Sequence, residues 1–377
     1  MKENKVKNQL LRDIIGVDFD WSEIDDLIVS DANILRPTVG YAFEYLVQEI
    51  FIKHFNIKLE TGSGDTDVDA FFYNANKKIT FQIKTPLKSS IKKDIHFAYI
   101  LHKTHGIEKR PNNLYPIKFP CHICDHEGES FPDFLIGKHP ENGVVIIPKN
   151  NIDESETYPG HFADPFKLEY DTEFLNNWSL LGFKSFNKKN LLRPKLPNKQ
   201  LKFPKVSKMI NLDDNEIIDL FTRPENFRLL HMNIRGNLRE PFVKKLLKSK
   251  CIPLKDIVEN YPKYDVLTES DIKIQIKGCS KSYSNKDLSI IGTEVMGTHG
   301  NGANRRYNTT HFDYLCIVIE PFYLPDKFNF KKNQYSYVFI KSTQLPLHHK
   351  NKEWGTKDKI YENCKFKIVE KQDGYYI

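Results

Sequence analysis

Two sets of polar residues recur along the sequence, and each could hold a metal ion beside a phosphate. The first set is Glu44, Asp69, Gln82 and Lys84, and the second is Glu240, Asp265, Gln275 and Lys277. An Asp and a Gln offer two oxygens to a hard cation such as Mg²⁺, and a Lys two residues after the Gln lies on the same face of a strand. A metal and a lysine are suited to hydrolysing a phosphodiester in line, because the metal stabilises the developing charge.

The spacing within the two sets is nearly the same. The two Glu are 196 residues apart, as are the two Asp, whereas the two Gln and the two Lys are 193 apart. The three-residue difference falls in a turn. The offset of 193 continues at Lys88 and Lys281, and Asp133 and Asp313 each precede an apolar strand. This agreement predicts a tandem duplication of one α/β unit.

The same elements are expected to position both sets. In each half an Asp opens one strand and Gln-x-Lys lies on the next, so that strand, turn and strand form a hairpin. The Glu of each set lies in a segment with helical spacing of apolar residues. The expected strands are 68–72, 79–84, 264–267 and 272–277, and the expected helices cover 41–50 and 238–247.

The order Glu, Asp, Gln-x-Lys resembles the PD-(D/E)xK nuclease superfamily in its Gln variant, which is similar to some type II restriction endonucleases and to transposon end-cleaving enzymes. The resemblance covers the catalytic core of both halves. It implies an α/β fold of two tandem domains, each a central mixed β-sheet flanked by α-helices. It also implies Mg²⁺-dependent DNA cleavage that leaves 5′-phosphate and 3′-hydroxyl ends.

The resemblance assigns roles to the matching residues. Each Gln replaces the usual acid and removes one negative charge, so we expect weak metal affinity until a phosphate arrives. The Mg²⁺ ligands would be Asp69, Gln82, Asp265 and Gln275; the lysines serving the attacking water would be Lys84 and Lys277; and Glu44 and Glu240 match the helical acid.

The length and the distribution of charge predict two domains and an anionic partner. The chain has 377 residues and a net charge of +7, and 377 residues are enough for two cores. Residues 187–208 carry eight Lys or Arg, three Pro and no acid, so the rest of the chain sums to −1. We predict domains at 1–186 and 209–377, joined by this extended basic linker, which is either merely solvated or a strap that also contacts phosphates.

Two loops beyond the lysines carry side chains suited to reading bases. Arg pairs with guanine and Asn with adenine in the major groove, while the alternative is an ordinary mobile surface loop. The candidate DNA-binding residues are Lys88, Arg110, Asn112 and Asn113 in the first half, and Lys281, Asn304, Arg305 and Arg306 in the second.

The cysteines favour a reducing compartment, and two of them could belong to a structural zinc site. Six Cys in 377 residues are too few for a disulfide framework, so we interpret them as thiols. Cys121, Cys124 and His126 lie in an insertion found only in the first half and form most of a structural Zn²⁺ site. A fourth ligand would have to come from His102, His105 or His139. A thioredoxin-like role lacks the strand-to-helix context.

Other classes of protein are disfavoured. There is no long apolar run and no secretory signal, so we expect a cytoplasmic protein that does not engage a membrane. There is no phosphate-binding loop, so no nucleotide cofactor is expected. We interpret the chain as a monomeric restriction endonuclease that cuts double-stranded DNA and is paired with a DNA methyltransferase acting on the same site. The alternatives are a repair, recombination or transposition nuclease, and a DNA-binding protein with inactive nuclease-like domains.

Overall fold

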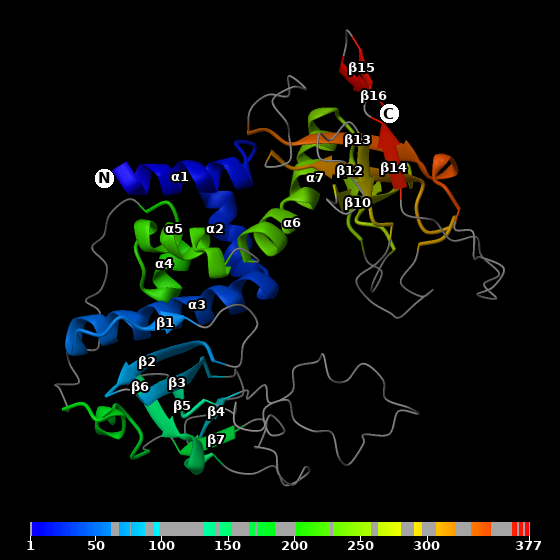
Figure 1. Cartoon of the computed structure of the whole chain (residues 1–377). Coiled ribbons are helices and arrows are strands. Elements are labelled where there is room, and N and C mark those ends of the chain that lie inside the picture. The colour runs from blue at the N-terminus through cyan, green and yellow to red at the C-terminus, as the bar shows by residue number, and fades with distance from the viewer. Residues whose placement is uncertain are drawn as a thin grey trace, which may run out of the picture. The chain divides into compact units, whose positions relative to one another are not determined.

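The chain forms two compact units (Figure 1). We name Leu35–Asp214 the contiguous unit, and Met1–Ile34 together with Asn215–Ile377 the split unit. Both are α/β, and each contains a mixed five-stranded sheet. The computed structural model describes residues 2–61, 68–75, 77–86, 94–97, 132–139, 143–152, 166–169, 172–184, 201–226, 229–257, 263–279, 290–295, 307–321, 333–347, 364–367, 369–371 and 374–376.

The sheet of the contiguous unit has the order β1-β2-β3-β5-β6. β3 and β5 run parallel, and the other neighbours are antiparallel. The predicted hairpin is confirmed as β2 and β3, and the chain reverses at Ala75, whose φ is 46°. The strands are β1 (Glu60–Thr61), β2 (Ala70–Asn74), β3 (Lys77–Lys84), β5 (Phe134–His139) and β6 (Gly143–Pro148).

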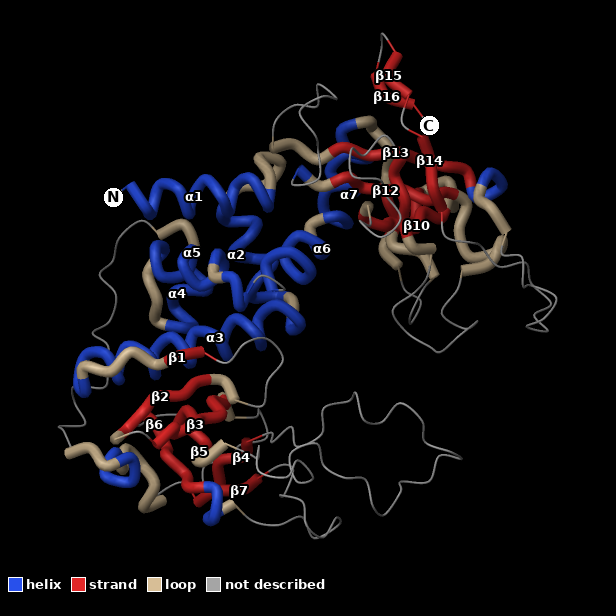
Figure 2. The backbone as a smooth tube through the Cα atoms, in the orientation of Figure 1, coloured by secondary structure: helices blue, strands red, loops and turns tan. Residues whose placement is uncertain are grey.

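A helix covers one face of this sheet, as Figure 2 shows. α3 (Ala32–Ile50) continues into a π-helical turn, η1 (Phe51–Phe55). Its buried Phe43 and Val47 belong to one core cluster with Phe81 of β3. Because side chains alternate along a strand, this packing directs Phe81 and Ile83 toward the helix and the residues next to them toward the opposite face.

The contiguous unit also contains elements that are not part of its five-stranded sheet. They are the antiparallel pair β4 (Asp94–Phe97) and β7 (Phe166–Glu169), the 3₁₀ turns η4 (Lys149–Asn151) and η5 (Trp178–Leu181), and α4 (Pro204–Ile210).

One sequence expectation is wrong at the end of the basic linker. Residues 204–208 were expected to be extended, but they form the start of α4. Pro204 occupies the first turn of this helix, where a missing N–H costs nothing and the fixed φ suits a helix. Residues 187–200 lie outside the described part of the chain.

The sheet of the split unit has the order β8-β9-β10-β12-β13. Again one central pair, β10 and β12, is parallel and the other neighbours are antiparallel. The second predicted hairpin is confirmed as β9 and β10. The strands are β8 (Leu254–Lys255), β9 (Val266–Thr268), β10 (Lys273–Gly278), β12 (Tyr314–Ile319) and β13 (Ser336–Lys341).

Helices and small strand pairs complete the split unit. Its other elements are α1 (Lys2–Ile15), α2 (Trp21–Ser30), α5 (Asp214–Thr222), η7 (Pro224–Asn226), η8 (Leu229–Ile234), α6 (Arg235–Asn237), α7 (Arg239–Ser249), η12 (Ser342–Gln344), β11 (Ile290–Thr293), β14 (Cys364–Lys367), β15 (Val369–Lys371) and β16 (Gly374–Tyr376). None of the helices in the described ranges is long and apolar enough to cross a bilayer.

The two sheets match strand by strand in order and in pairing direction. Their registers match as well. In the parallel pairs, Gln82 lies opposite Leu135 and Gln275 lies opposite Leu315. The residue correspondences expected from the sequence spacing are therefore also the correspondences of the strand pairing.

The first residues of the chain pack within the split unit. The backbone N–H of Tyr335 donates to Asp18 Oδ2 (2.6 Å), and Asn333 Nδ2 donates to Asp13 Oδ1 (2.9 Å). Sequence spacing placed this segment in a domain 1–186, whereas the compact units group residues 1–34 with residues 215–377.

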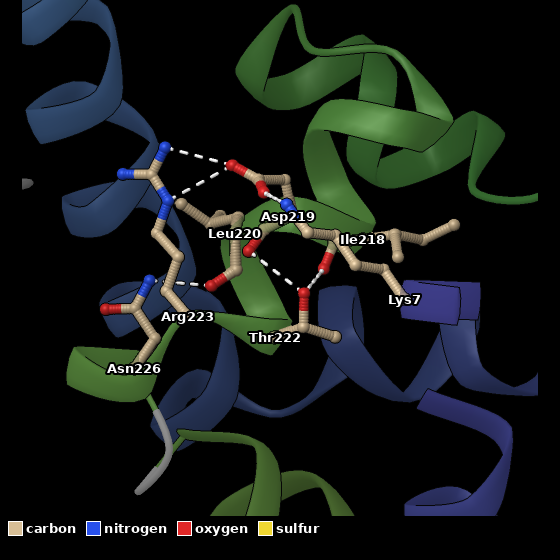
Figure 3. Close-up of polar contacts among 7 residues, drawn as sticks. All are labelled: Lys7, Ile218, Asp219, Leu220, Thr222, Arg223 and Asn226. Atoms are coloured by element: carbon tan, nitrogen blue, oxygen red, sulfur yellow. Dashed lines mark hydrogen bonds and ion pairs between the residues drawn. The ribbon is translucent and has the colours of Figure 1, made fainter. Parts of the chain in front are cut away.

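A charged cluster between α1 and α5 adds to this attachment (Figure 3). Lys7 Nζ lies 2.5 Å from Asp219 Oδ1, and Arg223 Nη2 lies 3.0 Å from Asp219 Oδ2. Burial alone would raise the pKa of Asp219, but the hydrogen bonds from Lys7 and Arg223 outweigh it and hold this pKa below its ordinary value. The start of the chain is thus held to α5 by an ionised, partly buried carboxylate.

Candidate active sites

The first site is built on the hairpin of β2 and β3. Asp69 directly precedes β2, and its backbone N–H donates to the Phe81 carbonyl (2.9 Å). Its Oδ2 accepts a hydrogen bond from the backbone N–H of Ile83 (2.7 Å). The Asp69 carboxylate thus accepts the N–H that a backbone carbonyl of the neighbouring strand would otherwise accept. This hydrogen bond holds the carboxylate beside the residue between Phe81 and Ile83. That residue is Gln82.

Gln82 and Lys84 lie on the sheet face opposite the helix. Lys84 Nζ is 3.6 Å from Asp69 Oδ2, and both side chains are about a quarter exposed, 24% and 21%. Gln82 is buried, and its Oε1 accepts no hydrogen bond from any residue in the described ranges. The structure therefore brings three of the four predicted residues to one place.

The fourth predicted residue of the first site is on the expected helix. Glu44 lies on α3 beside the buried Phe43 and is itself partly exposed. That its carboxylate faces Asp69 stays a prediction.

The second site repeats the backbone arrangement of the first. The Asp265 N–H donates to the Ile274 carbonyl (2.9 Å), and Asp265 Oδ2 accepts from the Ile276 N–H (2.6 Å). Here the amide is also engaged, because Gln275 Nε2 donates to Asp265 Oδ2 (2.5 Å) and to the Ile276 carbonyl (3.2 Å). Gln275 is buried, as Gln82 is.

Charged groups from two elements surround Asp265. Burial raises the pKa of its carboxyl to about 6; the Ile276 hydrogen bond, Lys277 and Lys244 act to lower this pKa, and Glu240 acts to raise it. Glu240 on α7 is therefore close enough to interact with Asp265, as the sequence predicts for the helical acid. It also pairs with Lys244 one turn later (2.5 Å). Lys277 Nζ lies 5.1 Å from the ring centroid of Tyr307.

This environment predicts that Asp265→Asn stabilises the fold at neutral and higher pH. A folded-state pKa of about 6 instead of 3.8 means that ionising the buried carboxyl costs about 3 kcal/mol. The folded state binds the proton more tightly, so stability falls as pH rises from about 4 to 6 and the full cost is present above that range. We expect Asp265→Asn to gain about 1–3 kcal/mol near pH 8.

Calorimetric scans would check this prediction. The gain corresponds to a rise in Tm of a few degrees near pH 8 that shrinks as the pH falls and disappears below about pH 4, where the carboxyl is protonated in both the folded and the unfolded state. Asp271→Asn is the matched control, because Asp271 lies in the same hairpin with a side chain that is 76% exposed. Equal stability of wild type and Asp265→Asn at both pH values would contradict the conclusion that the Asp265 carboxyl is costly to ionise in the folded protein.

A second aspartate in each half holds the parallel strands in register. Asp133 Oδ2 accepts from the Thr80 N–H (2.9 Å), and Asp313 Oδ2 accepts from the Lys273 N–H (2.8 Å). The sequence marked this pair as corresponding but assigned it no role. Its role is to position the strands that carry Gln-x-Lys.

Sequence reasoning missed an ion pair that holds α7 against the end of β12. Arg239 Nε donates to Glu320 Oε1 (2.5 Å), and Glu320 is fully buried at the end of β12. The guanidinium lies over Gly278, where an added Cβ would be 2.1 Å from Arg239 Cζ. Since Glu240 follows Arg239, this pair fixes the part of α7 that faces Asp265. Because Arg239 and Glu320 are far apart in the sequence, no periodic pattern of residues predicts their contact.

The N-terminal segment supports the same helix. Lys245 forms an ion pair with Glu23, and its Nζ donates to the Asp18 carbonyl (3.2 Å). The residues that hold α7 in place therefore come from both parts of the split unit.

Gly278→Ala tests this packing. The new methyl group must displace Arg239 and leave the buried Glu320 unpaired, so we expect a loss of about 2–4 kcal/mol of stability. Gly236→Ala is the control, because nothing lies within 4 Å of its added Cβ and Ala favours a helix. Chemical denaturation of both variants measures the difference. Equal stability would show that the guanidinium moves aside at no cost.

Several predicted residues lie outside the described ranges. They are the zinc candidates Cys121, Cys124 and His126 with His102 and His105, and all the DNA-binding candidates, Lys88, Arg110, Asn112, Asn113, Lys281, Asn304, Arg305 and Arg306. His139 is described and lies buried at the end of β5. Within the described ranges, no three His, Cys, Asp or Glu side chains form a metal-binding group. The candidate ligand set at each hairpin instead combines an Asp with an amide oxygen.

Comparison with known proteins adds no identification. No protein-family model matches the chain, and no curated protein matches it either.

Proposed function

We propose that the chain is a sequence-specific, Mg²⁺-dependent double-strand DNA endonuclease of the type II restriction kind, with two tandem PD-(D/E)xK-type domains acting as a single-chain pseudo-dimer. One observation carries the proposal. In two sheets of the same strand order, an Asp carboxylate accepts the N–H of the residue that lies between the Gln and the Lys of Gln-x-Lys. A solvent-facing Gln and Lys would not require a buried Gln beside an Asp carboxylate bonded to the backbone at the same position twice.

The residues of the first site fit a hard divalent cation. Gln82 Oε1 is a buried oxygen without a hydrogen-bond donor in the described part of the chain, and a buried acceptor in that state is costly. A cation shared with the Asp69 carboxylate would satisfy it, and oxygen ligands suit Mg²⁺. When bound, the ion would supply charge stabilisation for the phosphate and the leaving oxygen.

The lysine and the carboxylates then have separate tasks. Lys84, 3.6 Å from Asp69, carries the positive charge that orients the attacking water and balances a phosphate oxygen. Lys277 takes the same role in the second site. Glu240 adds a negative charge beside Asp265, as the helical acid of this nuclease pattern would. Each site hydrolyses one strand, leaving a 5′-phosphate and a 3′-hydroxyl.

The proposed partner is duplex DNA, bound by one chain. The basic segment 187–208 concentrates eight positive charges, which suits a polyanion. Two sites in one chain remove the need for a homodimer. A DNA methyltransferase acting on the same sequence completes the proposal, since a restriction enzyme needs its host DNA protected.

Digestion of phage DNA tests the proposed function. Purified protein is incubated with supercoiled and linear phage DNA in Mg²⁺ and, separately, in EDTA, and the products are resolved on a gel. Discrete fragments that form only with Mg²⁺ are expected. DNA that stays intact in Mg²⁺ but is retarded on the gel would instead support a binding protein with inactive nuclease-like domains.

A further inference from the structure

The two sites differ in the state of their Gln side chain. In the first, Gln82 Oε1 is buried and accepts no hydrogen bond from the described residues. In the second, the Gln275 amide nitrogen donates to Asp265 Oδ2 (2.5 Å) and to the Ile276 carbonyl (3.2 Å). The nitrogen must face Asp265, because two oxygens at that distance would repel each other.

This difference matters because only the oxygen of an amide can bind a cation. The Gln82 oxygen has no hydrogen bond with the described residues to break. The Gln275 amide must turn over before its oxygen points to a metal shared with Asp265, and it then loses a charge-assisted hydrogen bond and a neutral one. Cation binding at the second site therefore competes with contacts already made inside the protein.

The surrounding charges act in the same direction. Glu240 is close to Asp265 and would attract a cation, but it is paired with Lys244 at 2.5 Å.

We propose that the two sites are unequal, with the Asp69–Gln82 site binding a divalent cation more tightly than the Asp265–Gln275 site, so that at limiting Mg²⁺ one DNA strand is cut before the other. This inference rests on the proposed function of both sites. It adds an order of events: metal loading at the hairpin of β2 and β3, a nicked intermediate, and then the second cut.

Binding of Mn²⁺ to the full chain, followed by the electron paramagnetic resonance signal of the free ion, tests the inequality without DNA cleavage. Wild type should show two classes of site whose dissociation constants differ by about tenfold or more. Asp69→Asn should lose the tighter class, and Asp265→Asn should keep it. Equal affinities, or loss of the tighter class in Asp265→Asn, would overturn the inference while leaving the proposed nuclease intact. Absence of Mn²⁺ binding in wild type, even with duplex DNA present to supply the phosphate, would overturn both.

A second variant tests whether the two hydrogen bonds donated by Gln275 limit cation binding at the second site. Gln275→Glu removes the N–H donor to Asp265 and supplies the second carboxylate, so the weaker class should tighten by about tenfold or more. Gln82→Glu is the matched control. It adds the same charge at the site where the Gln oxygen accepts no hydrogen bond from the described residues, so Mn²⁺ affinity of the stronger class should rise by a smaller factor. Equal gains in the two variants would mean that charge alone, not the Gln275 hydrogen bonds, limits the second site.

Discussion

Replacing Lys84 or Lys277 by Ala should turn a double-strand cutter into two different nickases. Each lysine lies at one hairpin and, on the proposed function, serves one scissile phosphate, so each variant should lose cutting of one strand by about 10²–10⁴-fold and keep cutting of the other. The two variants should nick opposite strands of the same recognition sequence. Denaturing gels of DNA labelled on either strand measure the two rates separately.

Lys77→Ala is the matched control for this pair. Lys77 lies on the same strand as Lys84, at its exposed start, and carries the same charge. It should cut both strands at the wild-type rate. If either single Ala variant lost cutting of both strands, one site would perform both cleavages, and the pseudo-dimer would be refuted.

Combining Asp69→Asn with Asp265→Asn should abolish cutting of both strands while DNA binding survives. Each substitution removes the carboxylate that the metal and the lysine of its site require, so we expect the rate to fall by at least about 10³-fold. Two negative charges near the phosphates are also lost, so binding should be unchanged or slightly tighter. Mobility-shift titrations and cleavage assays, run on the same protein, separate the two effects.

Asp271→Asn controls for the change of charge alone. Asp271 lies in the turn between β9 and β10 with a φ of 61°, a conformation that Asn also accepts. This variant should cut at the wild-type rate. Residual Mg²⁺-dependent cutting by the double variant would move the catalytic centre away from the two hairpins.

The sequence was most informative about the hairpins. Alternation of apolar and polar residues predicted β3 and β10, and the shared offsets predicted which residues correspond between the halves. Pairing of Gln82 with Leu135 and of Gln275 with Leu315 is consistent with those correspondences. Local patterns succeed here because register and alternation are properties of neighbouring residues.

Contacts between distant segments could not be predicted. Nothing in the composition of residues 1–34 indicates that Asp18 binds the N–H of Tyr335 or that Glu23 pairs with Lys245. The Arg239–Glu320 pair is equally invisible, because a buried ion pair has no periodicity. The difference between Gln82 and Gln275 has no counterpart in the sequence, since the two residues occur in the same motif.

A stoichiometric digestion tests the central claim most directly. DNA carrying one recognition sequence, as mapped from the phage digest, is mixed with an equimolar amount of protein, and Mg²⁺ starts the reaction. We predict that one chain cuts both strands of one site, at a rate independent of protein concentration, and that the Lys84→Ala, Lys277→Ala double variant binds the same DNA and leaves it intact. Cutting that requires two chains, or cutting by the double variant, would contradict the account.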